Sequence, residues 1–505
     1  MTNMPRSNPA YHLYKQKLTQ IADLNAAMAV LQWDQEVYMP AMGATLRAQQ
    51  LATLSGMAHD LGVEKELGSL LEELSKSDSL NKIEKINVTE TLRVYNDRKK
   101  YNTAFVIELS KTVSESFNAW QEAKRKKEFN LFLPFLSKLV DLKKKECDLL
   151  GYDEHPYDAL LNQFEPGLKT KKVSAIFTQL HNQLIPVTKK IADASQPNTD
   201  FLHFHFDKNK QWDFSLILLK QLNYDFNKGR QDISTHPFTT GFNANDVRVT
   251  TRINENDLFE MIGSSIHECG HALYEQGLPV NDYGLPSGEF LSLAIHESQS
   301  RLWENNVGRS LSFWKCNFQT LKNTFPDQLK NISVQQFYAA INTVKPSFIR
   351  TNADELTYHL HIMIRFELER DLFEGKIDVA DLKNEWNKKY NNYLGLKVED
   401  DSQGILQDVH WSHGMFGYFP TYSLGSMYAA QFFAAAKNEI KNLEAEIESG
   451  SNLPLLSWLR EKIHRHGKTF SADELCINIA GSELNIDFFM NYIREKYANL
   501  YSVNL

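Results

Sequence analysis

The spacing of apolar residues along the chain predicts a mostly helical protein. Apolar positions recur at intervals of three and four over residues 11–60, 82–127 and 131–150, with dense Lys and Glu between them. This is the pattern of amphipathic helices. Residues 210–222 repeat it, and residues 436–505 return to it. Glycine and proline are sparse in these segments, which suits long helices.

The middle of the chain carries more specific signals. Over residues 246–252 valines alternate with polar residues, which predicts a strand. Three further helices are expected over about 257–276, 287–306 and 352–373, and each ends close to a glycine. Residues 401–426 are rich in Gly, His and aromatic residues, and we expect a loop followed by the start of a helix. The layout is that of an α-rich enzyme with a small sheet, because strands and helices do not alternate.

The composition is that of a globular protein and disfavours a nucleic-acid-binding one. Hydrophobic residues make up 42% and charged residues 23% of the chain, as in an ordinary globular protein with a large core. Length alone would favour about three domains of roughly 150 residues. No linker, repeat or low-complexity tract divides the chain, so we expect one domain over residues 1–505. A net charge of −8 argues against nucleic acid as a partner.

The cysteines and the N-terminal segment favour a cytoplasmic protein. The segment Met1–Gln20 lacks the apolar core of a signal peptide, and no run of 18 apolar residues predicts a membrane span. The four cysteines fit no disulfide or zinc-finger pattern. They are widely spaced in the chain: Cys147, Cys269, Cys316 and Cys476.

The most informative motif is HECGH at residues 267–271. Histidines four residues apart project from the same face of a helix, so His267 and His271 can bind one ion. Glu297, in the run HESQS, can supply a third ligand from a second helix. Three protein ligands leave one coordination position open, which is typical of a catalytic zinc site.

Alternative interpretations exist for each part of this motif. HExxH alone can be a pair of solvated histidines on a helix face. The apolar neighbours of Glu297 indicate a largely buried helix, in which a carboxylate needs a partner or a metal. Gly270 either lets another group approach the backbone or simply allows tight helix packing.

Glu268, between the two histidines, is the candidate general base. A bound metal acidifies water and polarises the scissile carbonyl. Glu268 can then take the proton from the attacking water and pass it to the leaving amine. The alternative role for Glu268 is that of an orienting residue outside the chemistry.

Polar residues cluster before and within the predicted strand. His236 lies in the sequence His-Pro-Phe, where a loop role is the simpler interpretation. Asp246, Arg248 and Thr250 share one strand face, because strand side chains alternate. Without the rest of the chain, a salt-bridged strand face is the favoured interpretation.

Arg350 lies in the sequence IRTNAD, at the start of a predicted helix. Its planar guanidinium can bind a carboxylate through two hydrogen bonds. The alternative is an ordinary ion pair with Asp354 or a neighbour. His359 and His361, later in this helix, are unsuitably spaced for one metal, and we expect them to be packing or surface residues.

The sequence GILQDVHW at residues 404–411 ends beside a group of possible hydrogen-bond donors. A metallopeptidase needs donors directed at the oxyanion that develops on the carbonyl, and Tyr or His can serve. An aromatic packed loop is the alternative. The candidates are His410, His413, Tyr418 and Tyr422.

Taken together, these motifs resemble the M32 metallocarboxypeptidases. The resemblance extends to LQWD through MP at residues 31–40 and to GYFPTY at 417–422, and so covers nearly the whole chain. Six motifs occur in the expected order: HPF (236–238), DVRVT (246–250), HECGH (267–271), HESQS (296–300), IRTNAD (349–354) and GILQDVHW (404–411).

The resemblance implies roles for the candidate residues. Arg350 would hold the C-terminal carboxylate of the substrate, and Tyr422 would lie near the scissile bond. His410 would join Glu268 and Tyr422 in the chemistry, although His410 and His413 are not distinguished. The metal ligands would be His267, His271 and Glu297, and the substrate groove would be lined by His236, Arg248 and His413.

It also implies a fold and an activity. Family members are mostly helical, saddle-like bodies with a deep active-site groove, similar to oligopeptidases of the neurolysin type. They remove single C-terminal residues from peptides with broad specificity, and are commonly homodimers. Each subunit would bind one divalent ion, zinc first and cobalt as an alternative.

Three other functions compete with this one. An oligopeptidase or endopeptidase could use the same scaffold, and Arg350 distinguishes them, because a buried clamp for a free carboxylate favours exopeptidase action. A catalytically inactive peptide-binding scaffold is disfavoured by the intact Glu268. A metal store is disfavoured because a single three-ligand site stores little.

Overall fold

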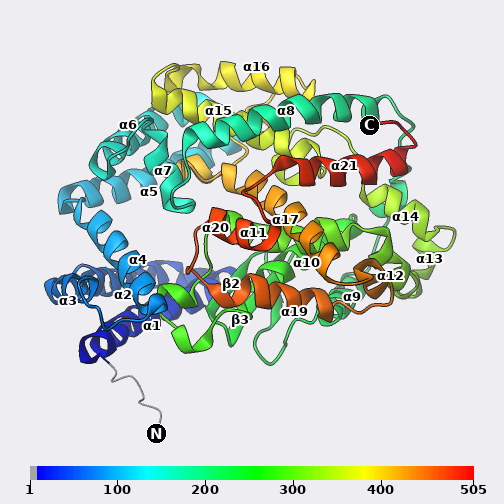
Figure 1. Ribbon diagram of the computed structural model, residues 1–505. Helices are drawn as coiled ribbons and strands as arrows, with labels where there is room; N and C mark the ends of the chain where they lie inside the picture. Colours follow the sequence, from blue (N-terminus) through cyan, green and yellow to red (C-terminus); the bar gives the residue numbers. More distant parts are fainter. Residues whose placement is uncertain (1–7) are drawn as a thin grey trace, which may run out of the picture.

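The computed structural model describes residues 8–505 and is built almost entirely of helices (Figure 1). Along the top lie α8 (Thr170–Ala192), α15 (Thr357–Glu374) and α16 (Leu382–Leu394). Along the bottom, with the sheet, lie α9 (Lys208–Gln221), α12 (Leu311–Thr324) and α19 (Leu453–Lys462). Between these two groups run α11 (Leu293–Arg301) and α17 (Pro420–Glu439) in both views. The predicted mainly helical fold with a small sheet is confirmed. Residues 1–7, part of the segment in which the sequence predicts no signal peptide, lie outside the described residues.

The N-terminal helices are shorter than the predicted segments. The single segment predicted over 11–60 is two helices, because Pro40 restricts the residue before it and interrupts the helical path. The segment predicted over 82–127 also divides, where Asn102 caps a new helix by accepting from the backbone N–H of Phe105. The observed helices are α1 (Pro9–Val37), α2 (Ala44–Gly62), α3 (Lys65–Ser75), α4 (Lys82–Lys99) and α5 (Thr103–Lys126).

The buried apolar side chains form two separate clusters. The larger one runs from α5 to α21 and surrounds the helices of the HECGH motif. The smaller one lies among α1, α3 and α4, with Tyr14 and Leu71 fully buried at its centre. Leu285 joins this small cluster from the middle of the chain. The N-terminal helices therefore have a core of their own.

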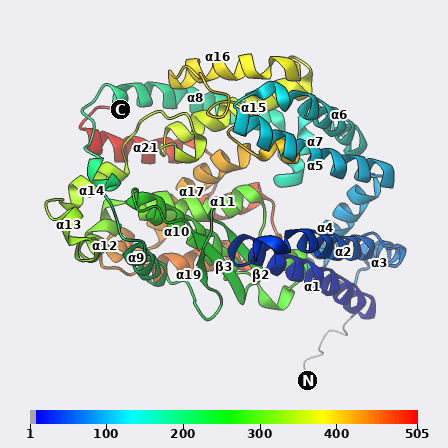
Figure 2. The same ribbon diagram turned by 180° about the vertical axis from the view of Figure 1, so that it is seen from behind.

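The sheet has three strands, of which the sequence predicts one. β3 (Asp246–Thr251) is central, parallel to β1 (Gln231–Ile233) and antiparallel to β2 (Thr239–Asn243). β1 is too short and β2 contains a glycine, so neither shows a clear alternation. Figure 2 shows α1 beside this sheet, where it packs against β2.

Three central helices carry the candidate site. α10 (Leu258–Glu275) matches its prediction and is capped by Asp257. α11 (Leu293–Arg301) begins six residues later than predicted, because Ser292 is its N-cap and residues 286–288 form a 3₁₀ turn. It continues directly into a π-helix over Leu302–Gly308. α17 (Pro420–Glu439) packs across α11.

The helix predicted over 352–373 is α15 (Thr357–Glu374). Arg350–Asn352 is a separate 3₁₀ turn. Asp354 then accepts hydrogen bonds from the backbone N–H groups of Leu356 and Thr357, which sets the start of α15. Residues 401–426 are a loop with a short 3₁₀ turn and the start of α17, as predicted.

The remaining helices enclose this centre. Within residues 8–505 no helix combines the length and apolar character needed to span a bilayer, and the four cysteines are free. That residues 1–505 form one domain stays a prediction. The helices are α6 (Leu133–Leu150), α7 (Tyr157–Phe164), α8 (Thr170–Ala192), α9 (Lys208–Gln221), α12 (Leu311–Thr324), α13 (Pro326–Leu329), α14 (Val334–Ile341), α16 (Leu382–Leu394), α18 (Leu443–Glu448), α19 (Leu453–Lys462), α20 (Ala472–Ala480) and α21 (Ile486–Tyr501).

Gly270 lies where α10 and α11 touch. A Cβ at this position would lie 2.6 Å from the Cα of Ser300 and 2.8 Å from the carbonyl oxygen of Gln299. The neighbouring backbone belongs to another helix, so of the two interpretations of Gly270 the tight helix packing is the one observed. On its other side α11 meets Gly425 of α17, where a Cβ would lie 2.6 Å from the side chain of Glu297.

We predict that Gly270→Ala destabilises the protein, because the added methyl group forces α10 and α11 apart. Overpacking of this kind costs about 1–3 kcal/mol of unfolding free energy. Gly56→Ala is the matched control, since Gly56 lies inside α2 with no atom within 4 Å of its Cβ position. That change should instead stabilise by about 0.5–1 kcal/mol. Urea unfolding of both variants checks the pair, and equal effects would contradict the packing argument.

Candidate metal centre and its surroundings

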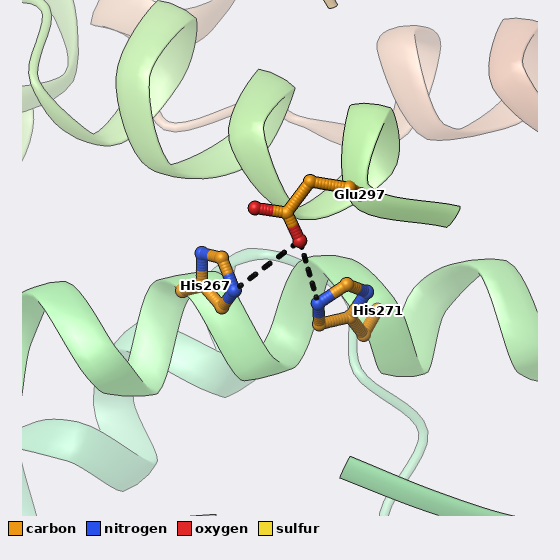
Figure 3. Close-up of side chains that lie close together, drawn as sticks. All are labelled: His267, His271 and Glu297. Carbon is orange, nitrogen blue, oxygen red and sulfur yellow. Dashed lines mark ion pairs between the residues drawn. The ribbon is translucent and has the colours of Figure 1, made fainter. Parts of the chain in front are cut away.

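Three side chains converge between α10 and α11 (Figure 3). His267 and His271 project from one face of α10, and Glu297 reaches between them from α11. The Oε2 atom of Glu297 is 3.9 Å from Nε2 of His267 and 3.5 Å from Nε2 of His271. Their potential ligand atoms all lie within 4.8 Å of one another. Two imidazoles and one carboxylate at this spacing are a suitable donor set for one divalent ion.

The surroundings of His271 and Glu297 favour the protonation states that metal ligands need. Burial lowers the pKa of His271 to about 3, which keeps its ring neutral. Burial alone would raise the pKa of Glu297, but Arg301 and His267 outweigh it and hold that pKa well below its ordinary value. A neutral imidazole and an ionised carboxylate are the forms that bind metal.

Glu304 holds the outer nitrogen of His267. Its Oε2 lies 2.8 Å from Nδ1 of His267, which directs Nε2 of that ring toward Glu297. Histidines that bind metal commonly donate their second N–H to such a carboxylate, which fixes the ring. Burial would raise the pKa of Glu304, yet Arg301 and His267 lower it to about 2. Glu304 is therefore ionised at neutral pH.

Arg301 orders both carboxylates of this group. Its Nε donates to Oε1 of Glu297 at 2.7 Å, and its guanidinium lies 3.1 Å from Oε2 of Glu304. Oε2 of Glu297 is thereby left facing the histidines. No motif in the sequence singles out Arg301 and Glu304. Their signal was their spacing, four and seven residues after Glu297, which places all three on one helix face.

His271 is held differently. Among the described residues nothing hydrogen-bonds its buried Nδ1. Its ring instead stacks on that of His296, with centroids 4.4 Å apart and planes at 19°. His296 is in turn bound by Glu275 at 2.9 Å. Packing rather than a hydrogen bond therefore orients His271.

Glu268 is buried beside the candidate metal ligands. The hydroxyl of Thr239, in β2, donates to Oε2 of Glu268 at 2.7 Å and leaves Oε1 free of that contact. Burial raises the pKa of Glu268 above its ordinary value. A carboxylate with a raised pKa is better suited to accept and return a proton near neutral pH. The small sheet thus orients Glu268, which the sequence did not indicate.

Arg350 is buried and pairs with Asp408, not with Asp354. The Asp408 carboxylate accepts from Arg350 at 2.9 and 3.0 Å and from Arg365 at 2.6 Å. Two guanidinium groups share one carboxylate, so the group retains one positive charge. Arg350 also donates to the hydroxyl of Tyr358 at 3.1 Å. The sequence indicated an ion pair for Arg350, but not this partner.

Tyr358 connects Arg350 to the metal centre. Arg301 lies over its ring, 4.5 Å from the centroid. The ring of Tyr422 meets that of Tyr358 edge-on at 6.2 Å, and Arg350 lies 5.0 Å from the Tyr422 centroid. The carboxylate clamp suggested by the sequence and the three metal-site residues therefore belong to one contiguous group of side chains.

The two candidate histidines of the 401–426 loop differ in position. His410 is buried, with Nε2 3.2 Å from the hydroxyl of Tyr422, and burial lowers its pKa to about 3. His413 is exposed and stacks on Phe117 at 4.8 Å. Tyr418 lies near Tyr422, with ring centroids 5.2 Å apart. The structure brings together His410 and Tyr422, but not His413.

The candidates near the sheet are not bonded to the triad in the described residues. His236 is exposed, and Arg248 pairs with Asp246 at 2.9 Å while lying over the ring of Trp33. Within residues 8–505, no hydrogen bond or ion pair joins His236 or Arg248 to the triad. The salt-bridged strand face is thus observed, and a substrate role for both residues stays a prediction.

His359 and His361 are buried in α15, so of the two expected roles they are packing residues and not surface residues. His359 is bound to the hydroxyl of Ser423, and His361 to that of Tyr390, each at 2.9 Å. Neither points to a second metal site.

Comparison with known proteins agrees with this geometry. The family model described as Carboxypeptidase Taq (M32) metallopeptidase matches residues 13–497. Carboxypeptidase 1 of Bacillus subtilis is 40% identical over 496 residues, covering 97% of this chain and 99% of its own. Thermostable carboxypeptidase 1 of Thermus thermophilus is 38% identical, covering 97% and 98%. The crystal structure of M32 carboxypeptidase from Deinococcus radiodurans superposes with a TM-score of 0.96 at 37% identity, covering 98% and 100%.

We predict that Glu304→Gln weakens the binding of a divalent ion, measured with zinc, by about 10- to 100-fold, as loss of such an outer contact does in other metal sites. The amide keeps the size of the side chain but removes the charge beside His267. Competition with a chromophoric chelator measures the affinity. Glu448→Gln, on an exposed carboxylate that pairs with Lys315, is the control. Equal zinc affinities for the two variants would exclude the role of Glu304.

Proposed function

The chain belongs to the M32 metallopeptidase family and is a carboxypeptidase, and we propose that it removes single C-terminal residues from peptides with one divalent ion held by His267, His271 and Glu297. The observation that carries this proposal is the buried positive charge at Arg350. It lies in contact with Tyr358 and Tyr422, beside the metal triad.

Arg350 is suited to bind the free carboxylate of a substrate. Asp408 compensates only one of the two guanidinium groups that it contacts, Arg350 and Arg365. A buried charge without a partner is costly, so a second carboxylate at this place is favoured. The C-terminus of a peptide supplies one, whereas an internal peptide bond does not. This distinguishes carboxypeptidase from endopeptidase action.

The residues present fit a zinc ion. The donor set matches zinc, and the second nitrogen of His267 is held by Glu304 as in other zinc sites. Cobalt is the alternative, because the same ligands accept it. When bound, the ion supplies Lewis acidity toward the scissile carbonyl and toward water.

Glu268 moves the proton in the proposed reaction. As the water oxygen bonds to the scissile carbonyl carbon, one water proton passes to a carboxylate oxygen of Glu268. When the C–N bond breaks, Glu268 returns that proton to the leaving amine nitrogen. Thr239 holds Oε2 of Glu268 during both transfers. The base thus ends as it began, ready for another cycle.

Tyr422 and His410 act on the developing oxyanion. Burial raises the pKa of Tyr422 well above its ordinary value, so its hydroxyl keeps its proton and can donate. His410 lies within hydrogen-bond distance of that hydroxyl and orients it. Donors placed beforehand in a buried site stabilise such charge effectively.

The finer properties follow from the family resemblance alone. We include in the proposal broad specificity, a deep active-site groove, a homodimer and a cytoplasmic location. His236, Arg248 and His413 would contact parts of the peptide further from the scissile bond. Their exposed or half-buried positions leave them accessible to such a substrate.

We expect wild-type protein to shorten a peptide stepwise from a free C-terminus, to leave its amidated twin uncleaved, and to lose activity when a chelator removes the metal. Mass spectrometry of the products checks all three. Internal cleavage of both peptides would instead establish an endopeptidase. No cleavage after zinc or cobalt is restored would support an inactive scaffold.

Arg350→Gln should reduce the preference for the free C-terminus over the amide. Asp408 keeps Arg365 as its partner, so the variant leaves no carboxylate unpaired. Loss of a charge-assisted contact of this kind lowers kcat/KM for the free peptide by about 10- to 100-fold. An unchanged preference would remove Arg350 from its proposed role.

Glu268→Gln should abolish turnover while leaving the metal in place. The variant removes the proton acceptor without removing a ligand, so kcat should fall by about 10²- to 10⁴-fold. Metal content by mass spectrometry should match that of wild type. Retained activity at full metal content would refute the mechanism.

A further inference from the structure

The carboxylate of Glu369 is fully buried on α15 and receives three hydrogen bonds. Oε1 accepts from the indole N–H of Trp411 at 2.6 Å. Oε2 accepts from the hydroxyl of Tyr157 at 2.6 Å and from the backbone N–H of Gly417 at 2.9 Å. Among the described residues no Lys, Arg or His side chain pairs with it. A buried carboxylate held only by neutral donors needs an explanation.

The donors to Glu369 flank the residues proposed for the chemistry. Trp411 directly follows His410, and Gly417 comes shortly before Tyr422 in the chain. One helical turn before Glu369, Arg365 binds Asp408 at the start of the same loop. α15 therefore contacts the loop at three places: Arg365 binds Asp408, and Glu369 binds Trp411 and Gly417.

The far side of the loop is fixed by α7. Gly417 has a positive φ of 90°, and a Cβ there would lie 2.7 Å from the backbone of Leu160. Tyr157, at the start of α7, supplies the third donor to Glu369. The loop between Asp408 and Gly417 is thus enclosed between α7 and α15, with the Glu369 carboxylate as their common acceptor.

We infer that Glu369 is a positioning residue for the reaction, which keeps His410 and Tyr422 within hydrogen-bond distance by fixing the loop through Trp411 and Gly417. The inference rests on the proposed function of His410 and Tyr422. Glu369 touches neither substrate nor metal in this arrangement, and acts through the loop.

The role requires a carboxylate and no other acceptor of this size. The indole N–H of Trp411 and the backbone N–H of Gly417 can only donate, and they bind different oxygens of Glu369. A glutamine offers one oxygen, so its NH₂ group must face one of these two N–H groups. Tyr157 is different, because a hydroxyl can turn and accept.

The test compares Glu369→Gln with Tyr157→Phe as the matched control. Each removes part of the same buried hydrogen-bonded group, but Tyr157→Phe leaves both oxygens for Trp411 and Gly417. We expect kcat on a peptide with a free C-terminus to fall roughly 10- to 100-fold in Glu369→Gln with a smaller change in KM, because catalytic groups are displaced. Tyr157→Phe should keep wild-type kcat, and zinc content should match wild type in both. Burial raises the pKa of Glu369 to about 7, so the assays belong at about pH 8.5, where it is ionised.

A second variant separates positioning from plain loss of stability. Trp411→Phe removes one N–H donor and keeps an aromatic ring, so it should also lower kcat. In that background the glutamine at position 369 can turn its NH₂ group away from Gly417 and toward the vacated side. The Glu369→Gln defect should then be smaller than in wild type.

The outcomes distinguish this inference from the proposed function. Inactivity of the wild-type enzyme on the free peptide would refute the proposed function, whatever the variants do. An active wild type, with Glu369→Gln and Tyr157→Phe equal in kcat, would overturn the inference while leaving the function intact. If Glu369→Gln does not fold, wild-type kcat in Trp411→Phe would overturn it equally.

Discussion

The close approach of α11 to its two neighbours is the constraint on which the site depends. Glu297 must reach between two imidazoles of α10 from a helix that is buried on every side. Gly270 lets the α11 backbone touch α10, and Gly425 removes the side chain that would collide with Glu297 from α17. Since interiors are close-packed, a methyl group at either place displaces the carboxylate from the histidines. The geometry of the candidate metal centre thus depends on the absence of side chains at Gly270 and Gly425.

Because the helices are this close, the charged side chains between them are buried, and each needs a partner of opposite charge nearby. Glu297 and Glu304 share Arg301 on one side of Tyr358, and Arg350 and Arg365 share Asp408 on the other. In the first group Arg309 also lies 3.6 Å from Glu304, so two carboxylates face two guanidinium groups. In the second group two guanidinium groups face one carboxylate. Under the proposed function, a substrate carboxylate is the complement of this excess positive charge.

Local chemistry was predictable from the sequence, and long-range partners were not. His267, His271 and Glu297 are found together because a helical spacing and a conspicuous motif mark them. Asp408 and Glu369 reach their partners across many residues of chain, and no local pattern indicates such contacts. The strands β1 and β2 were missed for the related reason that short strands are defined by their neighbours. Helix boundaries shifted where a cap such as Ser292 or Asp354 decided them.

The second hydrophobic core gives the protein two levels of local stability. Tyr14, Leu71 and their neighbours hold α3 and α4 together without drawing on the side chains around the metal centre. Cooperative units of unfolding often coincide with such groups of packed elements. Because α1 also packs against β2, we expect only α3 and α4 to open at a lower free energy than α10, α11 and α17. Heating, or a mutation in the smaller cluster, would then unfold α3 and α4 before it disturbed the helices that carry the candidate site.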